Sequence, residues 1–241
     1  MISARSARDR VEFDFCSLEK VRKGLMVTMQ DAAPADGERA ARSAGAAERG
    51  RPEITLPRGR VLLVGTGAFG VTGLPSWALL MRMWYGWSLR AGLTHSAAAL
   101  VSRDALAAAT QAPVEGPEWR TSMGVVPHLE LAEWPDLVIV APATTAFIAK
   151  CALGMPDSLV LSAVLATRAP VVIAPSIPES TLERPAVRRN LEALQEDGFH
   201  VVPPRPGVSA HKGGEIASGM PDLVTTLRFA QHVLERSPAQ G

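Results

Sequence analysis

The stretch PDLVIVAPATTAFIAKCALGMPDSLV, from Pro135 to Val160, sets an apolar run directly against small and hydroxylated residues. Its first part, PDLVIVAP, is apolar at nearly every position, which predicts a strand buried on both faces of a sheet. Thr144 and Thr145 follow, and threonine is a frequent cap at the N-terminus of a helix. We therefore expect a buried strand that leads at once into a helix over residues 144–162.

The same alternation extends outward over the chain from Arg58. The other runs that predict strands are RVLLVGT, SLRAGLT, APVVIAP and FHVVPP. Helical periodicity occurs in LPSWALLMRMWYGW, SAAALVSRDALAAA, residues 185–197 and MPDLVTTLRFAQHVLER. Alternating strands and helices, with strands apolar throughout, predict an α/β fold in which helices cover both faces of a parallel sheet. Such sheets bind ligands at the carboxyl ends of their strands.

The N-terminal residues differ from the rest of the chain. The segment MQDAAPADGERAARSAGAAERGRPE is rich in Ala, Gly, Arg and acidic residues and has few large apolar side chains. Such a segment buries too little apolar surface to offset the entropy of ordering. We therefore predict a disordered extension over residues 1–57 and one folded domain over residues 58–241.

Composition narrows the classes of function. The formal net charge of the 241 residues is +1, which gives no electrostatic drive toward nucleic acid. No apolar run approaches the roughly 20 residues that span a bilayer, so we expect no membrane partner. Cys16 and Cys151 are the only cysteines and lack metal-ligand spacing, so we expect no metal site and a cytoplasmic location.

A glycine-rich turn, GTGAFG, follows the first predicted strand. Gly65, Gly67 and Gly70 match the spacing of a dinucleotide-binding turn. However, no acidic residue lies between Arg58 and Asp104, where the ribose-binding acid of such a site belongs. The turn therefore favours a single phosphate at a helix N-terminus, although it could also serve only to join strand to helix.

Hydroxyl groups gather at the next two junctions between strand and helix. Together with the glycine turn they form a polar cup for a phosphate and a planar ring, which predicts flavin mononucleotide, with FAD as the alternative. The alternative role for these hydroxyls is to cap their helices. The predicted cofactor-binding residues are Gly65, Thr66, Gly67, Ala68, Phe69, Thr94, Ser96, Ala143, Thr144 and Thr145.

The segments APATTAFIAKCALGMPDSLVLSAVLATRAPVVIAP and RPAVRRNLEALQEDGFHVVPP resemble the homo-oligomeric flavin-containing cysteine decarboxylases. This family includes phosphopantothenoylcysteine decarboxylases and the lantibiotic decarboxylases, which oxidatively decarboxylate the C-terminal cysteine of a peptide to an enethiol. The resemblance covers about residues 60–234. It implies a Rossmann-like (flavodoxin-like) three-layer fold and a homo-oligomer, a trimer or dodecamer, with flavin at the subunit interfaces.

The resemblance also implies roles for individual residues. His128, in VVPHLELAEWPDLV, falls at the family's catalytic histidine, just before the third predicted strand. Two active-site asparagines of the family are replaced, one by Ala146 and the other by Pro178. The implied substrate-binding residues lie in two segments, Pro175, Ser176, Ile177 and Pro178, and Glu215, Ile216, Ala217, Ser218 and Gly219.

Four functions remain open, of which a flavin prenyltransferase would share the fold and the flavin, although the chain shows neither the serine-rich glycine loop nor the basic phosphate-binding pattern of that class. The segment HKGGEIASGMPDLV resembles the substrate flap of the epidermin decarboxylase, and no cysteine follows Cys151, which together favour oxidation of a peptide substrate. A phosphopantothenoylcysteine decarboxylase-like enzyme is the first alternative. A non-catalytic flavin-binding scaffold is the second, because both asparagines are missing. The flap itself could be an ordinary mobile glycine-rich loop.

An aromatic cluster on and after the first predicted helix, formed by Trp77, Trp84, Tyr85 and Trp87, bears on assembly. The apolar surface of these four rings is larger than one thin domain readily buries, which predicts that they form a contact between subunits. The alternative is that these rings belong to the core.

Overall fold

The structure is a computed structural model and describes residues 51–119, 125–208 and 213–236. The predicted disordered extension over residues 1–57 lies mostly outside the described residues. Its last seven residues are described, and two of them contact the end of helix α3 (Leu74–Tyr85). The guanidinium of Arg51 donates to the carbonyl oxygen of Trp84 at 2.8 Å, and the hydroxyl of Tyr85 donates to the carbonyl oxygen of Pro52 at 2.7 Å.

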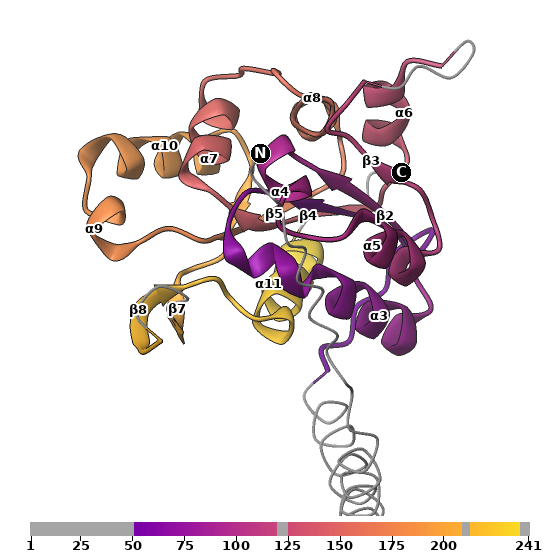
Figure 1. The fold of residues 1–241 in the computed structure, drawn as a ribbon, viewed down its shortest axis with the longest axis horizontal. Coiled ribbons are helices and arrows are strands. Elements are labelled where there is room, and N and C mark those ends of the chain that lie inside the picture. Colours follow the sequence, from indigo (N-terminus) through magenta and orange to yellow (C-terminus); the bar gives the residue numbers. More distant parts are fainter. Residues whose placement is uncertain (1–50, 120–124, 209–212, 237–241) are drawn as a thin grey trace, which may run out of the picture. The chain divides into compact units, whose positions relative to one another are not determined.

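A six-stranded parallel sheet forms the centre of the described chain (Figure 1). Its order is β3-β2-β1-β4-β5-β6, and each neighbouring pair is parallel. The order reverses between β1 and β4, which makes their carboxyl ends the switch point at which such sheets bind ligands. The predicted α/β, Rossmann-like fold is thus confirmed. The strands are β1 (Arg60–Gly65), β2 (Ser88–Leu93), β3 (Val114–Glu115), β4 (Leu137–Ala143), β5 (Val171–Pro175) and β6 (His200–Val201).

Helices cover both faces of this sheet (Figure 1). One face carries α3 (Leu74–Tyr85), α5 (Arg103–Thr110) and α11 (Leu223–Arg236). The other face carries α6 (Pro127–Glu133), α7 (Thr145–Ala152), α8 (Leu159–Ala166) and α10 (Pro185–Glu196). Three short elements follow strand ends, namely η1 (Phe69–Gly73), α4 (His95–Ala98) and α9 (Glu179–Leu182).

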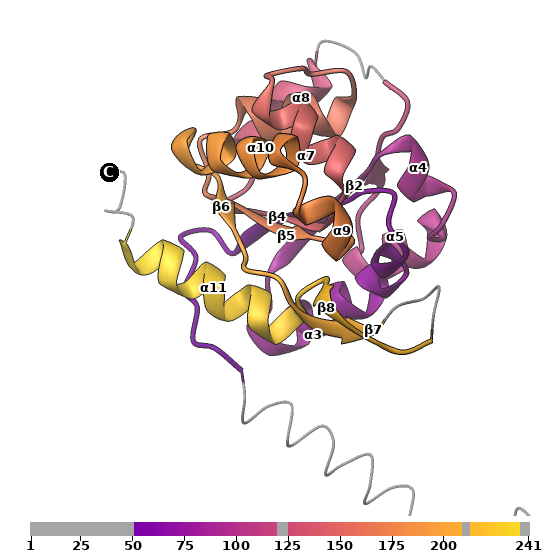
Figure 2. The same cartoon turned by 90° about the vertical axis from the view of Figure 1, so that its left-hand side faces the viewer.

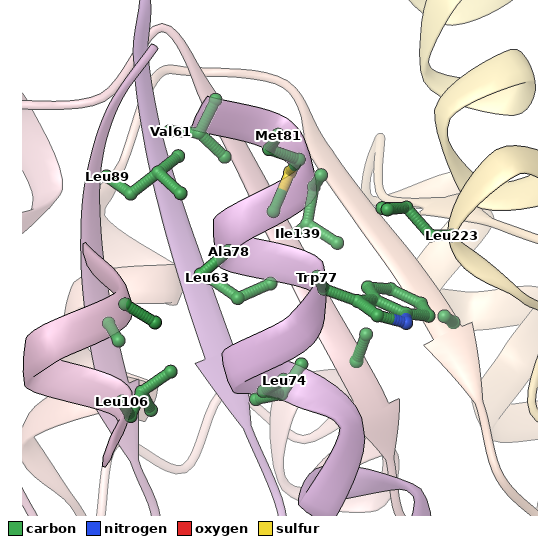
Figure 3. Close-up of a cluster of buried hydrophobic side chains, with 14 of the residues drawn as sticks. Val61, Leu63, Leu74, Trp77, Ala78, Met81, Leu89, Leu106, Ile139 and Leu223 are labelled. Atoms are coloured by element: carbon green, nitrogen blue, oxygen red, sulfur yellow. The ribbon is translucent and has the colours of Figure 1, made fainter. Parts of the chain in front are cut away.

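Successive side chains of β1 point to opposite faces of the sheet, so the strand contributes to two separate hydrophobic cores. Val61 and Leu63 point toward α3, where they meet residues such as Leu74 and Met81 (Figure 3). Leu62 points the other way, into the cluster beneath α7 and α8. All of these side chains are fully buried. The apolar strands of the sequence therefore serve two cores at once, as a parallel sheet requires.

Two predicted helices are each broken into two. The single helix expected over residues 144–162 is α7 followed by α8, because Gly154 adopts a left-handed conformation (φ 61°) and Pro156 follows it. Ser158 then caps α8 by accepting the N–H of Leu161. The helix expected in SAAALVSRDALAAA is likewise α4 and α5, and Ser102 caps α5 by accepting the N–H of Ala105 at 3.2 Å.

The aromatic cluster lies in the core. Trp77, Trp84 and Trp87 are only 9%, 8% and 6% exposed, and Tyr85 stacks on Trp87 with ring centroids 4.1 Å apart. The expectation that these rings form a surface between subunits is wrong, because the three tryptophans are buried within the core cluster on the α3 side of the sheet and Tyr85 packs against it. Large apolar side chains are exposed elsewhere, including Trp119, Val126, Leu129 and Leu153.

The flap predicted in HKGGEIASGMPDLV contains a strand, Glu215–Gly219, while its first two residues lie outside the described residues. β7 (Arg205–Val208) and β8 (Glu215–Gly219) pair antiparallel and form a separate two-stranded sheet. Figure 2 shows this hairpin at the same end of the central sheet as α4 and α9. Within the described residues, no helix combines the length and apolar character needed to cross a membrane.

Candidate functional site

Hydrogen bonds join the carboxyl ends of four neighbouring strands into one rim: backbone bonds link β2 to β1 and β5 to β4, and the side chain of Thr66 links β1 to β4. The N–H of Thr94, after β2, donates to the carbonyl oxygen of Gly65 at the end of β1, at 3.1 Å. The N–H of Ser176, after β5, donates to the carbonyl oxygen of Ala143 at the end of β4, at 2.9 Å. The rim brings the loops predicted to bind cofactor and the loop predicted to bind substrate to one edge of the sheet.

Thr66 links the two central strands of this rim across the switch point. Its hydroxyl donates to the carbonyl oxygen of Pro142 at 2.7 Å and accepts the N–H of Thr144 at 2.9 Å. The residue is only 1% exposed. Its hydroxyl is therefore committed to holding the loop after β1 against the loop after β4, and the free surface of the site is formed by neighbouring residues.

The glycine turn packs directly on the start of α4. A Cβ atom at Gly67 would lie 2.3 Å from the Cβ of Ser96, which is far too close for two carbon atoms that are not bonded to each other. Glycine is thus required for the turn and α4 to approach this closely. Gly67 and Ser96, 29 positions apart in the sequence, meet at the carboxyl edge as the predicted phosphate cup requires.

The predicted capping role of the threonines is also present. The hydroxyl of Thr94 accepts the N–H of Ala97, and that of Thr144 accepts the N–H of Phe147, each at 3.4 Å. The first N–H groups of a helix have no acceptor within the helix, so α7 directs those at Thr145 toward the carboxyl edge. The half-buried hydroxyl of Thr145 and the exposed side chain of Ser96 lie beside this helix start, and hydroxyl and N–H donors of this kind bind phosphate in other proteins.

Two members of the predicted cofactor turn differ in exposure. Ala68 closes a tight turn by donating its N–H to the carbonyl oxygen of Thr66 at 2.8 Å, and it is partly buried. Phe69 is 66% exposed at the start of η1. An exposed aromatic ring beside a phosphate cup is suited to contact a planar ligand or another subunit.

His128 lies in the first turn of α6, which precedes β4. The two-residue strand β3 comes earlier in the chain, so the strand after His128 is the fourth and not the third. The Nδ1 atom of His128 is buried and has no hydrogen-bond partner among residues 51–119, 125–208 and 213–236, which is uncommon for a buried polar atom. Trp119 contacts the imidazole edge to face, with ring centroids 5.4 Å apart.

The two predicted substrate segments meet. The hydroxyl of Ser218, in β8, donates to the carbonyl oxygen of Ile177, after β5, at 3.1 Å. Both residues are buried, at 8% and 3% exposure. Pro175 is buried at the end of β5, Ser176 is partly buried and Pro178 is exposed at the start of α9. Ile216 and Gly219 pair with β7, while Glu215 and Ala217 contribute described backbone to the same strand.

The positions that differ from the resembled family lie in the same region. Ala146 is exposed in the first turn of α7, and Pro178 is exposed immediately before α9. Neither side chain offers a polar group. Any polar contact that a substrate makes beside them must therefore come from neighbouring backbone or hydroxyl groups.

Two residues of this edge were missed by the sequence analysis. Trp119 packs on His128, and Met220 packs on Gly70, where its Sδ atom lies 2.8 Å from the position of a Cβ. Trp119 lies outside every predicted element, and Met220 was assigned to the start of the last predicted helix, so only the proximity of each to a candidate motif could have drawn attention to it. Two hollows lie at the opposite edge, at the amino ends of the strands. One has a volume of about 650 Å³ and is lined by residues such as Ser88 and Arg90. The other has a volume of about 1360 Å³ and is lined by residues such as Asp136 and Val171.

Relatives of known activity share parts of this chain. Over 86 residues, the chain is 42% identical to the coenzyme A biosynthesis bifunctional protein CoaBC of Bacillus subtilis (strain 168). This match covers 36% of this chain and 21% of that protein. The chain thus spans about a fifth of the length of that relative.

Two crystal structures of FMN-dependent cysteine decarboxylases are similar over most of their length. TvaF, from thioviridamide biosynthesis, has a TM-score of 0.57 and 34% identity, covering 61% of this chain and 90% of that one. SpaF has a TM-score of 0.59 and 31% identity, covering 71% and 97%. These neighbours support FMN as the cofactor. The family model described as Flavoprotein matches residues 50–234, and this chain therefore belongs to the Flavoprotein family.

Proposed function

We propose that this chain is an FMN-dependent cysteine decarboxylase that converts the C-terminal cysteine of a peptide to an enethiol, with loss of CO2 and two hydrogens. The observation that carries the proposal is the hydrogen-bonded rim. It gathers a glycine turn, two helix starts and the hairpin at one edge of the sheet, on a chain similar to TvaF and SpaF.

The chemistry explains why such a site needs both a cofactor and a base. A cysteine carboxylate has no electron sink, so CO2 does not leave at a useful rate until the bond between Cβ and sulfur is oxidised. A bound flavin supplies the two-electron acceptor for that oxidation. The remaining tasks, which are to bind the phosphate, orient the peptide and accept the thiol proton, fall to residues of this chain.

Each task has a candidate group. We assign the phosphate to the N–H groups of the Gly67 turn and of α7, with the hydroxyls of Ser96 and Thr145. His128 accepts the thiol proton, since its Nδ1 atom has no competing partner. The hairpin and the loop after β5 orient the end of the peptide.

The test uses the purified full chain. We expect a yellow protein, or one that turns yellow on incubation with FMN, and we expect a peptide ending in cysteine to lose the mass of CO2 and two hydrogens. A protein that stays colourless with both FMN and FAD would contradict the flavin part. A yellow protein that leaves all such peptides unchanged would favour the non-catalytic scaffold, which Ala146 and Pro178 make a real alternative.

A second substrate follows from the similarity to CoaBC. Phosphopantothenoylcysteine also presents a terminal cysteine carboxylate, so the same site could accept it. Loss of CO2 alone from that compound, with no change in a peptide ending in cysteine, would make this second candidate the function.

We further propose that the protein is a homo-oligomer, a trimer or a dodecamer. The residues that flank His128 include Trp119, Val125, Val126 and Leu129, which are 49%, 38%, 50% and 44% exposed. Apolar side chains gathered beside a candidate catalytic residue favour burial by another subunit. Light scattering at micromolar concentration tests this, and a monomer would contradict it.

A further inference from the structure

The β7–β8 hairpin has no strand pairing with the central sheet, so other contacts must hold it in place. Within the part of the chain that the structure describes, its strands pair only with each other, and Gly207 and Gly219 face each other at its base. A Cβ atom at either glycine would lie within 3 Å of the other's Cα. The base of the hairpin is therefore narrow, and its two backbones are in direct contact.

Two side chains connect this base to the site loops. Ser218 donates its hydroxyl to the carbonyl oxygen of Ile177 at 3.1 Å, which attaches β8 to the loop after β5. Met220, one residue beyond β8, packs against Gly70 at the start of η1. The hairpin base thus touches both a loop proposed to bind substrate and the loop proposed to bind the flavin phosphate.

These two contacts differ in how readily they can be replaced. Met220 is a flexible side chain that can adjust its packing. The bond from Ser218 has a fixed acceptor, and both residues are buried. Without the hydroxyl, the carbonyl oxygen of Ile177 loses this partner, and a buried polar group without a partner is costly. We expect β8 to move away from the loop so that the carbonyl oxygen of Ile177 can reach water, because no strand pairing with the central sheet opposes this movement among the described residues.

We propose that Ser218 is a positioning residue that holds the β7–β8 hairpin on the loop after β5 and thereby sets the affinity for the peptide end of the substrate. The proposal rests on the function proposed above. The hydroxyl of Ser218 donates to the carbonyl oxygen of Ile177 and so is directed at the protein and not at the reacting atoms. Removing this hydroxyl should therefore weaken peptide binding and leave the chemical step nearly unchanged.

The first experiment measures turnover of a peptide ending in cysteine by the FMN-loaded full chain. For Ser218→Ala we expect KM to rise on the order of tenfold, with kcat within about threefold of the wild type and FMN affinity unchanged. Ser218→Thr keeps the hydroxyl and should restore most of the affinity. Ser88→Ala is the matched control, because Ser88 is an exposed serine at the amino end of β2. A fall in kcat at constant KM would overturn the proposal by placing Ser218 among the reacting atoms.

The second experiment does not depend on turnover. Amide hydrogen exchange of β8, followed by mass spectrometry, should be on the order of tenfold faster in Ser218→Ala, while exchange in β1 and β4 stays unchanged. Exchange of β8 at the wild-type rate would overturn the anchoring role. If the wild type decarboxylates no peptide, the proposed function fails, yet exchange still decides whether Ser218 anchors the hairpin. Fluorescence anisotropy of the labelled peptide then decides whether the anchor affects binding.

Discussion

Thr66 and Thr144 are joined by a 2.9 Å hydrogen bond in which the N–H of Thr144 donates to the hydroxyl of Thr66. They lie 78 positions apart, one after β1 and the other after β4. The same hydroxyl donates to Pro142, so one side chain satisfies a donor and an acceptor at the switch point. The relative position of the two loops depends on it.

Thr66→Val keeps the shape of the side chain and removes the hydroxyl. We expect the free energy of unfolding to fall by about 1–3 kcal/mol, because a buried N–H and a buried carbonyl lose their partner. FMN affinity should fall as well, since the two loops lose their common link. Thr66→Ser keeps the hydroxyl and serves as the control. Urea denaturation and fluorescence titration measure both effects, and equal stability of the Val and Ser variants would contradict this role.

His128→Asn removes the proposed proton acceptor from the first turn of α6. We expect turnover of a peptide ending in cysteine to fall about 10²- to 10⁴-fold, the usual contribution of a positioned general base. The fold and FMN binding should persist, because the Nδ1 atom makes no hydrogen bond that the change would break. His232→Asn is the control, since that side chain is 73% exposed on α11. Near-normal turnover of the His128 variant would rule out the assigned role.

Asp136 couples stability to pH at the amino end of β4. Burial by itself raises the pKa of this carboxyl, but hydrogen bonds from the Arg58 side chain and from the N–H groups of Arg60 and Arg58 outweigh burial and lower the pKa. A lowered pKa in the folded state contributes stability above the unfolded-state pKa of about 3.9, and this contribution is lost as pH falls through the folded-state pKa.

Asp136→Asn should therefore cost about 1–3 kcal/mol of unfolding free energy at pH 7, because hydrogen bonds to a charged group are lost. The gap between variant and wild type should narrow as pH falls below the unfolded-state pKa of about 3.9, and it should close once pH passes the lower folded-state pKa, where the folded wild-type carboxylate also becomes protonated. Denaturant unfolding of both proteins over a series of pH values measures this difference in unfolding free energy. Asp104→Asn, at an exposed position in α5, is the comparison, and a gap that does not change with pH would refute the coupling.

Cys151 should be chemically inert in the native protein. Burial raises the pKa of its thiol to about 12, and the residue is 2% exposed. A Cys16→Ser variant leaves Cys151 as the only thiol. We expect that variant to react with a disulfide reagent at pH 8 only after addition of guanidinium, since the thiolate is the reactive form. Stoichiometric reaction within minutes in native buffer would show that the thiol is accessible.

The alternation of apolar strands and helices was sufficient to predict the α/β class and the edge of the sheet that carries the candidate site. The reason is local: a strand buried on both faces must be apolar throughout, and PDLVIVAP is apolar at nearly every position. Capping by Thr94 and Thr144 was equally predictable, because a cap and its acceptor lie within one turn.

Contacts between distant segments were decided only by the tertiary structure. The hydroxyl of Thr66 could have faced a ligand, but folding brings Pro142 and Thr144 to it from 76 and 78 positions away. Ser218 reaches Ile177 across 41 positions, and Trp77 is turned into the core although it could equally have covered a surface. A sequence states which side chains can donate, accept or be buried. Which partner each one meets depends on how the strands are ordered and packed, because hydrogen bonds and burial act over a few ångströms in space, whatever the separation along the chain.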